Sequence, residues 1–295
     1  MCYESCHSRE SGNPEISKTL DPRFREDDKN VRENMNFDQQ RFNDFLLTHN
    51  VVGFFEKPMT LKSGRQSCWY VNWRNVSNDV VLLDQLTDFV IAFAHSKRLQ
   101  FDGFYGVPEG ATKLGILTNY KWAMAQSDCV PGKYVLSMGR AKPKEHGALQ
   151  DKYFIGVPKG KVIVLEDVTT TGGSLLETLE SLAQVEVEVV AAIGLTNRMQ
   201  KRDDGKSVEE ALVKKGITYF AMSRATDFLP EAMKRFHPSQ EIVKSLQQEF
   251  AEIGVKPCNF NIEMAAGSVC RAASSDAGNE ASIPGRLKRR QKSGV

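Results

Sequence analysis

The stretch VIVLEDVTTTGGSLLETLE groups acids, hydroxyls and glycines in the middle of the chain. Its apolar residues predict a buried strand over 161–165, which delivers Glu166 and Asp167 at its carboxyl end, where parallel sheets bind their ligands. A loop over 168–173 and a helix from Ser174 then present unpaired amides that suit a phosphate. A carboxylate facing phosphate alone would repel it, so the acids indicate a sugar diol or a magnesium ion as well.

Phosphate, ribose hydroxyls and metal together describe phosphoribosyl pyrophosphate. An ordinary strand–turn–helix connection without a ligand explains the acids and glycines equally well, because a short acidic turn forms easily. The run is neither the GxGxxG of dinucleotide-binding folds nor the GxxxxGK[ST] of nucleotide triphosphatases.

A second group of chemically active side chains stands in GRAKPKEHG, residues 139–147. Its basic or protonatable members are Arg140, Lys142, Lys144 and His146. A charge run is usually a solvated face, and a loop histidine is usually just exposed. A polyphosphate is nevertheless the natural counter-ion of such a cluster, because charge-assisted hydrogen bonds to phosphate are strong.

Two further stretches have the composition of binding loops. LKSGRQSCWYVNWR, residues 61–74, offers Lys62 to a negative charge and Tyr70 to a flat ring. Lys62 and Arg65 are also explained as solvated turn residues, and this stretch alone favours that interpretation. The glycine-rich turn in FYGVPEGATKLG, residues 104–115, lets a backbone approach an anion closely, although a βα turn without a ligand has the same composition.

Taken together, these stretches resemble orotate phosphoribosyltransferases in order and spacing. The central run resembles the signature of type I phosphoribosyltransferases, in which four hydrophobic residues precede [ED]D and a small or polar segment ends in TGG[ST]. LKSGRxS followed by an aromatic residue and an asparagine is largely private to the orotate enzymes, and R-x(3)-K-x-H-G resembles their mobile catalytic loop. The resemblance covers roughly 37–255. It implies an α/β fold, with a central, mostly parallel sheet flanked by helices and a small N-terminal hood region.

The resemblance implies transfer of a phosphoribosyl group from phosphoribosyl pyrophosphate to orotate, in pyrimidine biosynthesis. The residues that it assigns to catalysis are Arg140, Lys144, His146 and Asp167. Those that it assigns to the sugar donor are Lys62, Glu166, Asp167, Thr169, Thr170, Thr171, Gly172, Gly173 and Ser174. Those that it assigns to orotate are Lys62, Tyr70, Thr170 and Arg198.

The same resemblance implies a cofactor and a partner. Magnesium is expected mainly on the diphosphate of the donor, without a dedicated protein site, and a homodimer is expected in which the catalytic loop closes over the neighbouring subunit's active site. The transition state should resemble an oxocarbenium ion, so the protein's task is mainly electrostatic. From the residues alone, Arg198 is better explained as a surface arginine in a loop with Lys201 and Arg202.

The chain departs from the family pattern at Ala141, at Glu109 and after Gly147, where it reads ALQDKYF, and other functions stay open. Ala141 stands where many members have a second basic residue, and Glu109 lies in a turn that carries a lysine in some bacterial members. One alternative is a phosphoribosyltransferase for another base, although purine enzymes lack LKSGRxS and the K-x-H-G loop. The other is a non-catalytic regulator that senses phosphoribosyl pyrophosphate and binds nucleic acid, which only the basic tail over 286–292 supports.

The elements that must position these residues are visible as periodic segments. Amphipathic helices are predicted over 37–50, with Asp38 near the start, and over 79–94, with Val80 on the buried face. Strand-like and helical segments then alternate, in the order FDGFYGV, ATKLGILTNYKWAMA, KYVLSM, KVIVLE, SLLETLESLA, VEVVAAIGL, SVEEALVKKG and ITYFAM. Such alternation predicts a parallel α/β sheet.

Composition narrows the class of protein. A chain of 295 residues with 41% hydrophobic and 26% charged residues is expected to be a soluble globular protein, and a net charge of +2 does not indicate nucleic-acid binding. No apolar run is long enough for a membrane span. Six scattered cysteines without a CxxC pair favour a reduced, cytoplasmic protein without a structural metal.

Both ends of the chain are expected to lie outside the catalytic domain, which we place at 36–255. Residues 1–35 lack a sustained period and resemble the translation of a dispersed bacterial repeat, so the natural start is expected at Met35. Residues 256–295 are small and polar with a basic end. Both flanking segments are predicted to be disordered.

Overall fold

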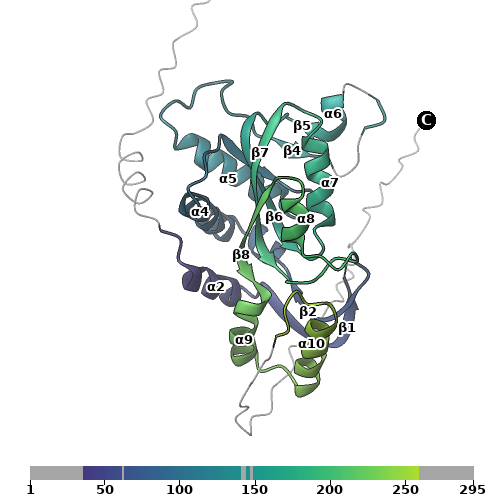
Figure 1. The fold of residues 1–295 in the computed structure, drawn as a ribbon. Helices are drawn as coiled ribbons and strands as arrows, with labels where there is room; N and C mark the ends of the chain where they lie inside the picture. Colours follow the sequence, from purple (N-terminus) through teal and green to yellow (C-terminus); the bar gives the residue numbers. More distant parts are fainter. Residues whose placement is uncertain (1–35, 62, 141–143, 147–148, 259–295) are drawn as a thin grey trace, which may run out of the picture. The chain divides into compact units, whose positions relative to one another are not determined.

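A computed structural model of the chain describes residues 36–61, 63–140, 144–146 and 149–258 (Figure 1). The segment 1–35 with its predicted start, and the tail from 259 onward, lie outside the described residues. The centre of the fold is a four-stranded sheet of β3 (Gly103–Gly106), β6 (Gly160–Thr169), β7 (Val187–Asn197) and β8 (Thr218–Arg224), in that order. All neighbouring strands of this sheet are parallel, which confirms the predicted α/β class.

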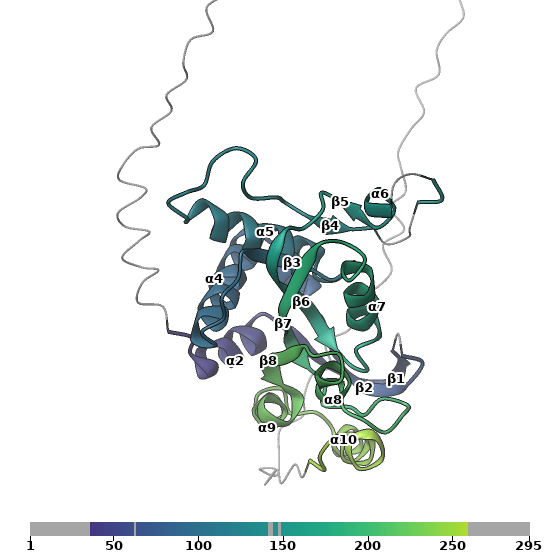
Figure 2. The same cartoon turned by 45° about the horizontal axis from the view of Figure 1, so that its top comes forward.

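Helices cover both faces of the sheet. Figures 1 and 2 show α4 (Val80–Ser96) and α5 (Thr112–Met124) on one side, and α7 (Gly173–Leu182) and α8 (Val208–Val213) on the other. Because both faces are covered, β6 is apolar without alternation. Ile163 and Leu165 pack into the larger core, and Val164 between them packs into the smaller core beneath α7.

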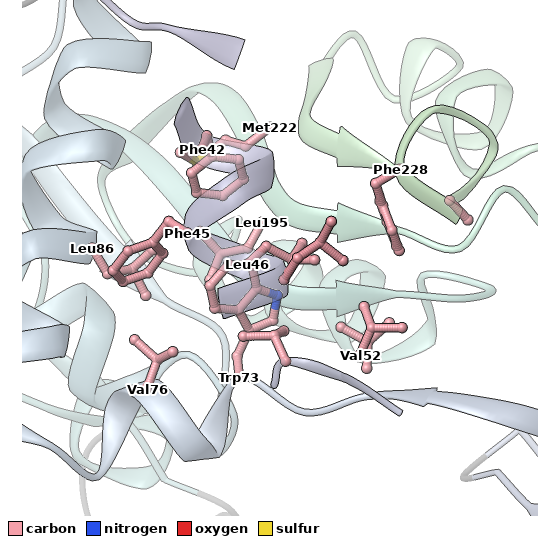
Figure 3. Packing of buried hydrophobic residues seen from close by; sticks show 14 of the residues in the cluster. Phe42, Phe45, Leu46, Val52, Trp73, Val76, Leu86, Leu195, Met222 and Phe228 are labelled. Atoms are coloured by element: carbon pink, nitrogen blue, oxygen red, sulfur yellow. The ribbon is translucent and has the colours of Figure 1, made fainter. Parts of the chain in front are cut away.

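The N-terminal part consists of α2 (Gln39–Thr48), an antiparallel hairpin of β1 (Val52–Thr60) and β2 (Gln66–Val71), and the short α3 (Arg74–Ser77). The predicted first helix is confirmed, and Asp38 caps it by accepting a hydrogen bond from the Arg41 amide at 3.0 Å. Figure 3 shows how α2 enters the larger core, where Phe42 stacks on Trp73 with 5.7 Å between ring centroids. Trp73 also donates through Nε1 to Thr196 Oγ1 of β7 at 3.0 Å, so this part is fixed to the sheet.

Two C-terminal helices, α9 (Ala225–Phe236) and α10 (Gln240–Ile253), complete this part of the chain, and α10 contacts β2. Neither helix is among those that the apolar spacing predicts above. A small antiparallel pair of β4 (Met138–Gly139) and β5 (Phe154–Ile155), with α6 (Leu149–Tyr153) between them, lies beside the sheet. No helix in the described part of the chain is long and apolar enough to cross a membrane.

Three details of the predicted elements are wrong. KYVLSM is not a strand of the parallel sheet, because the Val135 carbonyl oxygen accepts from the Asn119 side chain and pairing begins only at Met138. Val80 is 82% exposed, since it is the first residue of α4 and its side chain has no preceding turn to cover. The strand predicted over 161–165 runs on to Thr169, where it still pairs with β7, so the predicted loop is shorter at its start.

Candidate active site

Strand β6 carries the two acids of the signature and leads through a short turn into α7. Glu166 is buried, at 6% exposed, and Asp167 is half-buried. After Thr169 the turn closes at Gly172, whose φ of +73° is a left-handed conformation that glycine adopts without strain. Helix α7 begins at the next residue, so its unpaired amides lie within a few residues of both acids.

The three threonines of this turn lie in different environments. Thr169 is buried, and its Oγ1 accepts a hydrogen bond from the Tyr219 hydroxyl at 2.9 Å. Burial raises the pKa of Tyr219, so this hydroxyl stays a neutral donor. Thr170 and Thr171 are half-buried, and Arg202 Nη1 donates to the Thr171 carbonyl oxygen. Thr169 therefore anchors the turn from inside, and only the next two side chains are partly open to solvent.

The glycine-rich turn after β3 meets the acids of β6. Gly110 lies so close to the Asp167 carboxyl group that a Cβ atom at Gly110 would be 2.6 Å from Oδ1. Glu109 beside it is exposed, and the Pro108–Glu109 peptide bond is cis. Two stretches that the sequence singled out separately therefore come together at Asp167.

The β1–β2 hairpin docks the LKSGR stretch onto the segment that follows β7. Arg65 donates through Nη1 to the Lys201 carbonyl oxygen at 2.7 Å and through Nη2 to Asp203 Oδ1 at 2.8 Å. The Arg65 side chain is only 17% exposed, so its interpretation as a solvated turn residue is wrong. Tyr70 is half-buried on β2, and Lys62 lies outside the described residues.

Arg198 follows β7 directly, and its guanidinium lies inside a polar cluster. The residue is 1% exposed, and its Nη2 donates to Ser67 Oγ at 2.9 Å and to Glu249 Oε1 at 3.1 Å. Its Cζ lies 3.8 Å from the centroid of the Trp69 ring, which is a cation–π contact. Burial lowers the pKa of Arg198 to about 10, against the opposing effect of Glu249, so the group stays charged at neutral pH. The interpretation as a surface arginine is wrong, and contact with orotate stays a prediction.

The predicted catalytic loop begins after β4 and returns through α6. The backbone amides of Arg140 and Lys144 donate to carbonyl oxygens of α6 at 2.8 and 3.1 Å. Arg140 is half-buried, Lys144 and His146 are exposed, and residues 141–143, 147 and 148 lie outside the described residues. Figures 1 and 2 both show α6 well separated from β1 and β2. Within a single chain, Lys144 and His146 beside α6 are therefore not placed next to the β1–β2 hairpin.

Sequence reasoning missed Glu249 of α10 and the role of Arg202. A signal for Glu249 existed, because it stands three residues after the buried Leu246 and so shares the apolar stripe of its helix. A carboxylate at such a position needs a buried partner. Nothing in the spacing indicates Arg202, whose partner is the backbone oxygen of Thr171.

The chain is similar in sequence to the orotate phosphoribosyltransferase of Bradyrhizobium diazoefficiens, with 31% identity over 179 residues, 58% of this chain and 87% of that protein. It is similar in fold to the orotate phosphoribosyltransferase of Francisella tularensis, with a TM-score of 0.53, 20% identity and coverage of 72% of this chain and 99% of that one. UMP synthase from Leishmania donovani gives a TM-score of 0.54 at 20% identity. There the match covers 72% of this chain but only 42% of the longer protein. No protein-family profile matches the chain.

Motifs and relatives point to the same family. The Bradyrhizobium protein is matched over most of its own length, and the two solved structures share the fold of this chain. Two of the three stretches on which the resemblance depends are distant in sequence, yet Arg65 of one is bonded to the segment after β7, and Arg202 joins that segment to the turn of the other. This chain therefore belongs to the orotate phosphoribosyltransferase family.

Proposed function

We propose that this protein transfers the phosphoribosyl group of 5-phosphoribosyl 1-diphosphate to orotate, giving orotidine 5′-phosphate and diphosphate in UMP biosynthesis. The observation that carries the proposal is the meeting of separate motifs at one end of β6. Arg65 ties the hairpin to the segment after β7, Arg202 ties that segment to the turn before α7, and Gly110 meets Asp167. The relative named as an orotate enzyme supports the choice of base.

In the proposed reaction, a ring nitrogen of orotate attacks C1 of the ribose. The bond from C1 to the diphosphate oxygen breaks, and its electron pair leaves with the diphosphate. Positive charge grows on the sugar ring and negative charge on the leaving group, so preorganised charges and dipoles are the main contribution of the protein. The ring nitrogen loses its N–H proton as the bond to C1 forms, and the departing diphosphate is basic enough to take that proton, so no strong general base from the protein is needed.

The donor and the base occupy neighbouring groups of residues in this proposal. Glu166 and Asp167 hold the ribose hydroxyls, as acids at a strand end suit a sugar diol. The 5-phosphate binds at the start of α7, where amides and the helix dipole favour an anion. The donors there come from the turn Thr169, Thr170, Thr171, Gly172, Gly173 and Ser174. Because the Thr169 side chain is buried, its contribution to the phosphate in this proposal is through the backbone.

Orotate is a flat anion, and the proposed contacts match both properties. Tyr70 offers an aromatic ring, Thr170 a hydroxyl, and Lys62 and Arg198 positive charges. Of these, Arg198 lies against the ring of Trp69, the residue before Tyr70 on β2.

Magnesium enters the proposal mainly through the diphosphate of the donor. Glu166 and Asp167 provide hard oxygen donors, and Mg²⁺ usually takes one or two carboxylates and fills its other positions with waters and substrate phosphates. The described residues contain no group of three or more His, Cys, Asp or Glu side chains placed to hold a metal. An ion bound in this way would neutralise charge on the departing diphosphate.

We propose further that Arg140, Lys144 and His146 stabilise the diphosphate in the active site of a second copy of the chain. Lys144 and His146 are exposed, and α6 lies away from the hairpin of its own chain. Closure of such a loop supplies cations to the leaving group and excludes water that would hydrolyse the donor. The proposal therefore includes a homodimer with shared active sites.

A cytoplasmic location completes the proposal. Cys68, Cys129 and Cys258 are free thiols in the part of the chain that the structure describes. Free thiols without disulfides are typical of a reducing compartment.

Orotate consumption, followed by its ultraviolet absorbance, tests the proposed function. Wild type should consume orotate only when phosphoribosyl pyrophosphate and Mg²⁺ are both present. Lys144→Ala should lose at least about a hundredfold in rate, because it removes a charge that stabilises the leaving group. Lys234→Ala, at a lysine of α9 that is 70% exposed, is the matched control and should keep the wild-type rate. Wild type that binds the donor but leaves orotate unchanged would move the assignment to another base or to a sensor.

A further inference from the structure

A buried polar cluster joins β2, the segment after β7, and α10. Glu249 Oε1 accepts from Arg198 Nη2 at 3.1 Å, from Trp69 Nε1 at 3.1 Å and from Gln200 Nε2 at 2.5 Å. Its Oε2 accepts from the Ser67 hydroxyl at 2.8 Å, and the same hydroxyl oxygen accepts from Arg198 Nη2 at 2.9 Å. Arg198 and Glu249 are therefore an ion pair held inside the protein and bridged by Ser67.

Stability alone does not explain this ion pair. The side chains of Arg198 and Glu249 are 2% and 9% exposed. Removing both charges from water is costly, and an apolar pair of similar volume often stabilises a fold equally well. Arg198 Nε and Gln200 Oε1 are buried and find no hydrogen-bond partner among the described residues. The buried guanidinium of Arg198 costs free energy of desolvation, and its Nε donor is unused. Together these two facts point to a role in binding.

The cluster borders the candidate active site. Arg198 follows the last residue of β7, and its amide donates to the Thr169 carbonyl oxygen at 2.9 Å, just before the phosphate-binding turn. Tyr70 follows Trp69 on β2, and the Trp69 ring centroid lies 3.8 Å from Arg198 Cζ. The guanidinium is thus beside the proposed binding surface for the base, but Glu249 already neutralises it.

We propose that Glu249 and Ser67 hold Arg198 in an internally paired state, and that the carboxylate of an anionic base competes with Glu249 for the guanidinium. The inference rests on the proposed function, in which Arg198 binds orotate. Glu249 is then a positioning residue that sets the affinity for the charged base and does not touch the reacting atoms. A ligand gains only the difference between its own interaction with Arg198 and the internal one, so the internal pair lowers the affinity.

Glu249→Gln removes the competing charge and keeps the shape. The new carbonyl oxygen can accept from Arg198 and Trp69, and the new amide can donate to Ser67, whose hydroxyl then donates to the Trp69 carbonyl oxygen at 3.0 Å. Isothermal titration without Mg²⁺ measures binding without turnover. The Kd for orotate should fall at least about threefold, because charge pairs of this kind couple strongly. The Kd for uracil, the same ring without the carboxylate, and that for phosphoribosyl pyrophosphate should stay within about twofold of wild type.

The matched control is Glu252→Gln on the same helix. Glu252 is exposed and accepts from Gln248 at 2.8 Å. Its charge is screened by solvent and is not paired with Arg198, so orotate binding should not change. Since leaving Arg198 unpaired destabilises the fold, Ser67→Ala is the second variant. It removes the bridging hydroxyl, keeps both charges, and should also tighten orotate binding.

Two results would overturn the inference in different ways. Unchanged or weaker orotate binding in both variants, with donor binding at the wild-type level, would show that Glu249 does not compete with the base. A wild-type protein that binds the donor but not orotate would instead refute the base assignment on which the inference rests.

Discussion

Gly110 lies close against the Asp167 carboxyl group in the candidate active site, and this contact supports a test of a single residue. In Gly110→Ala the new Cβ atom would lie 2.6 Å from Asp167 Oδ1, too close for either group to stay in place. The side chain is the more flexible partner, so the carboxylate should move away from the ribose that it is proposed to hold. We expect kcat/KM to fall at least about tenfold, because misplacing a binding group weakens the transition state. Steady-state kinetics and a thermal unfolding curve measure the two effects separately.

Gly53→Ala is the control for this change. Its Cβ atom would lie 3.6 Å from the ring of Phe55, which is an ordinary van der Waals contact. Activity should be unchanged, and Tm should move by no more than about 3 °C in either variant. If Gly110→Ala kept full activity, Asp167 would not be holding the ribose in the way that we propose.

The acids, hydroxyls and glycines of the signature could be assigned to a binding site from their residue types. The burial of Thr169 and Arg198 could not be predicted in this way. The Thr169 hydroxyl is bound to Tyr219, 50 positions away, and Arg198 is paired with Glu249, 51 positions away. Local spacing carries no information on partners at that separation. The environment of these two groups therefore became visible only in the folded chain.

At the scale of the element, the N-terminal cap of α8 offers a test of how pH changes the stability of the fold. The helix begins with a capping box, in which Ser207 Oγ accepts from the Glu210 amide at 3.1 Å and Glu210 Oε2 accepts from the Ser207 amide at 2.7 Å. The hydrogen bond from the backbone of Ser207 lowers the pKa of the Glu210 carboxyl below 4.5. The carboxylate form is therefore favoured by folding.

A carboxyl group with a lowered folded-state pKa adds stability that is complete above the unfolded pKa and is lost as pH falls through the folded value. We expect wild type to have a higher Tm than Glu210→Gln near neutral pH. The difference should shrink as pH falls below about 4.5, where the wild-type carboxyl takes up its proton. Thermal unfolding of both proteins between about pH 7 and pH 3 measures it. A difference that stayed constant over this range would contradict a stabilising charge.

Several elements with a strong period were predictable and irregular ones were not, but α9 and α10 were missed although their apolar residues have helical spacing. Helices α2 and α4 and the strands of the parallel sheet have apolar spacings that their burial explains. The β1–β2 hairpin was missed because β1 is exposed over most of its second half, so no alternation marks it. KYVLSM looks like a strand, but a side chain of α5 takes the hydrogen bond that a neighbouring strand would take. In the hairpin and in KYVLSM alike, contacts with distant parts of the chain determine the structure, and the local sequence pattern does not.

At the scale of the whole molecule, the proposed dimer makes each active site from two chains, and complementation tests this directly. Lys144→Ala would remove the loop cation from one contributor, and Asp167→Asn would remove the strand acid from the other. Each variant alone should be nearly inactive. Random pairing of equal amounts makes about half of the dimers mixed, and one of the two sites in each mixed dimer then has both residues. Co-expression should therefore restore about a quarter of the wild-type activity.

The double variant Lys144→Ala/Asp167→Asn, co-expressed with Asp167→Asn, is the control and should stay inactive, because no pairing supplies the strand acid. Two different affinity tags show that mixed dimers form, and light scattering gives their mass. If mixed dimers formed without recovery of activity, the loop would serve its own chain, and the proposal of shared active sites would be wrong. Figures 1 and 2 show α6 distant from β1 and β2 of its own chain, and for this reason we place the loop in the active site of the partner.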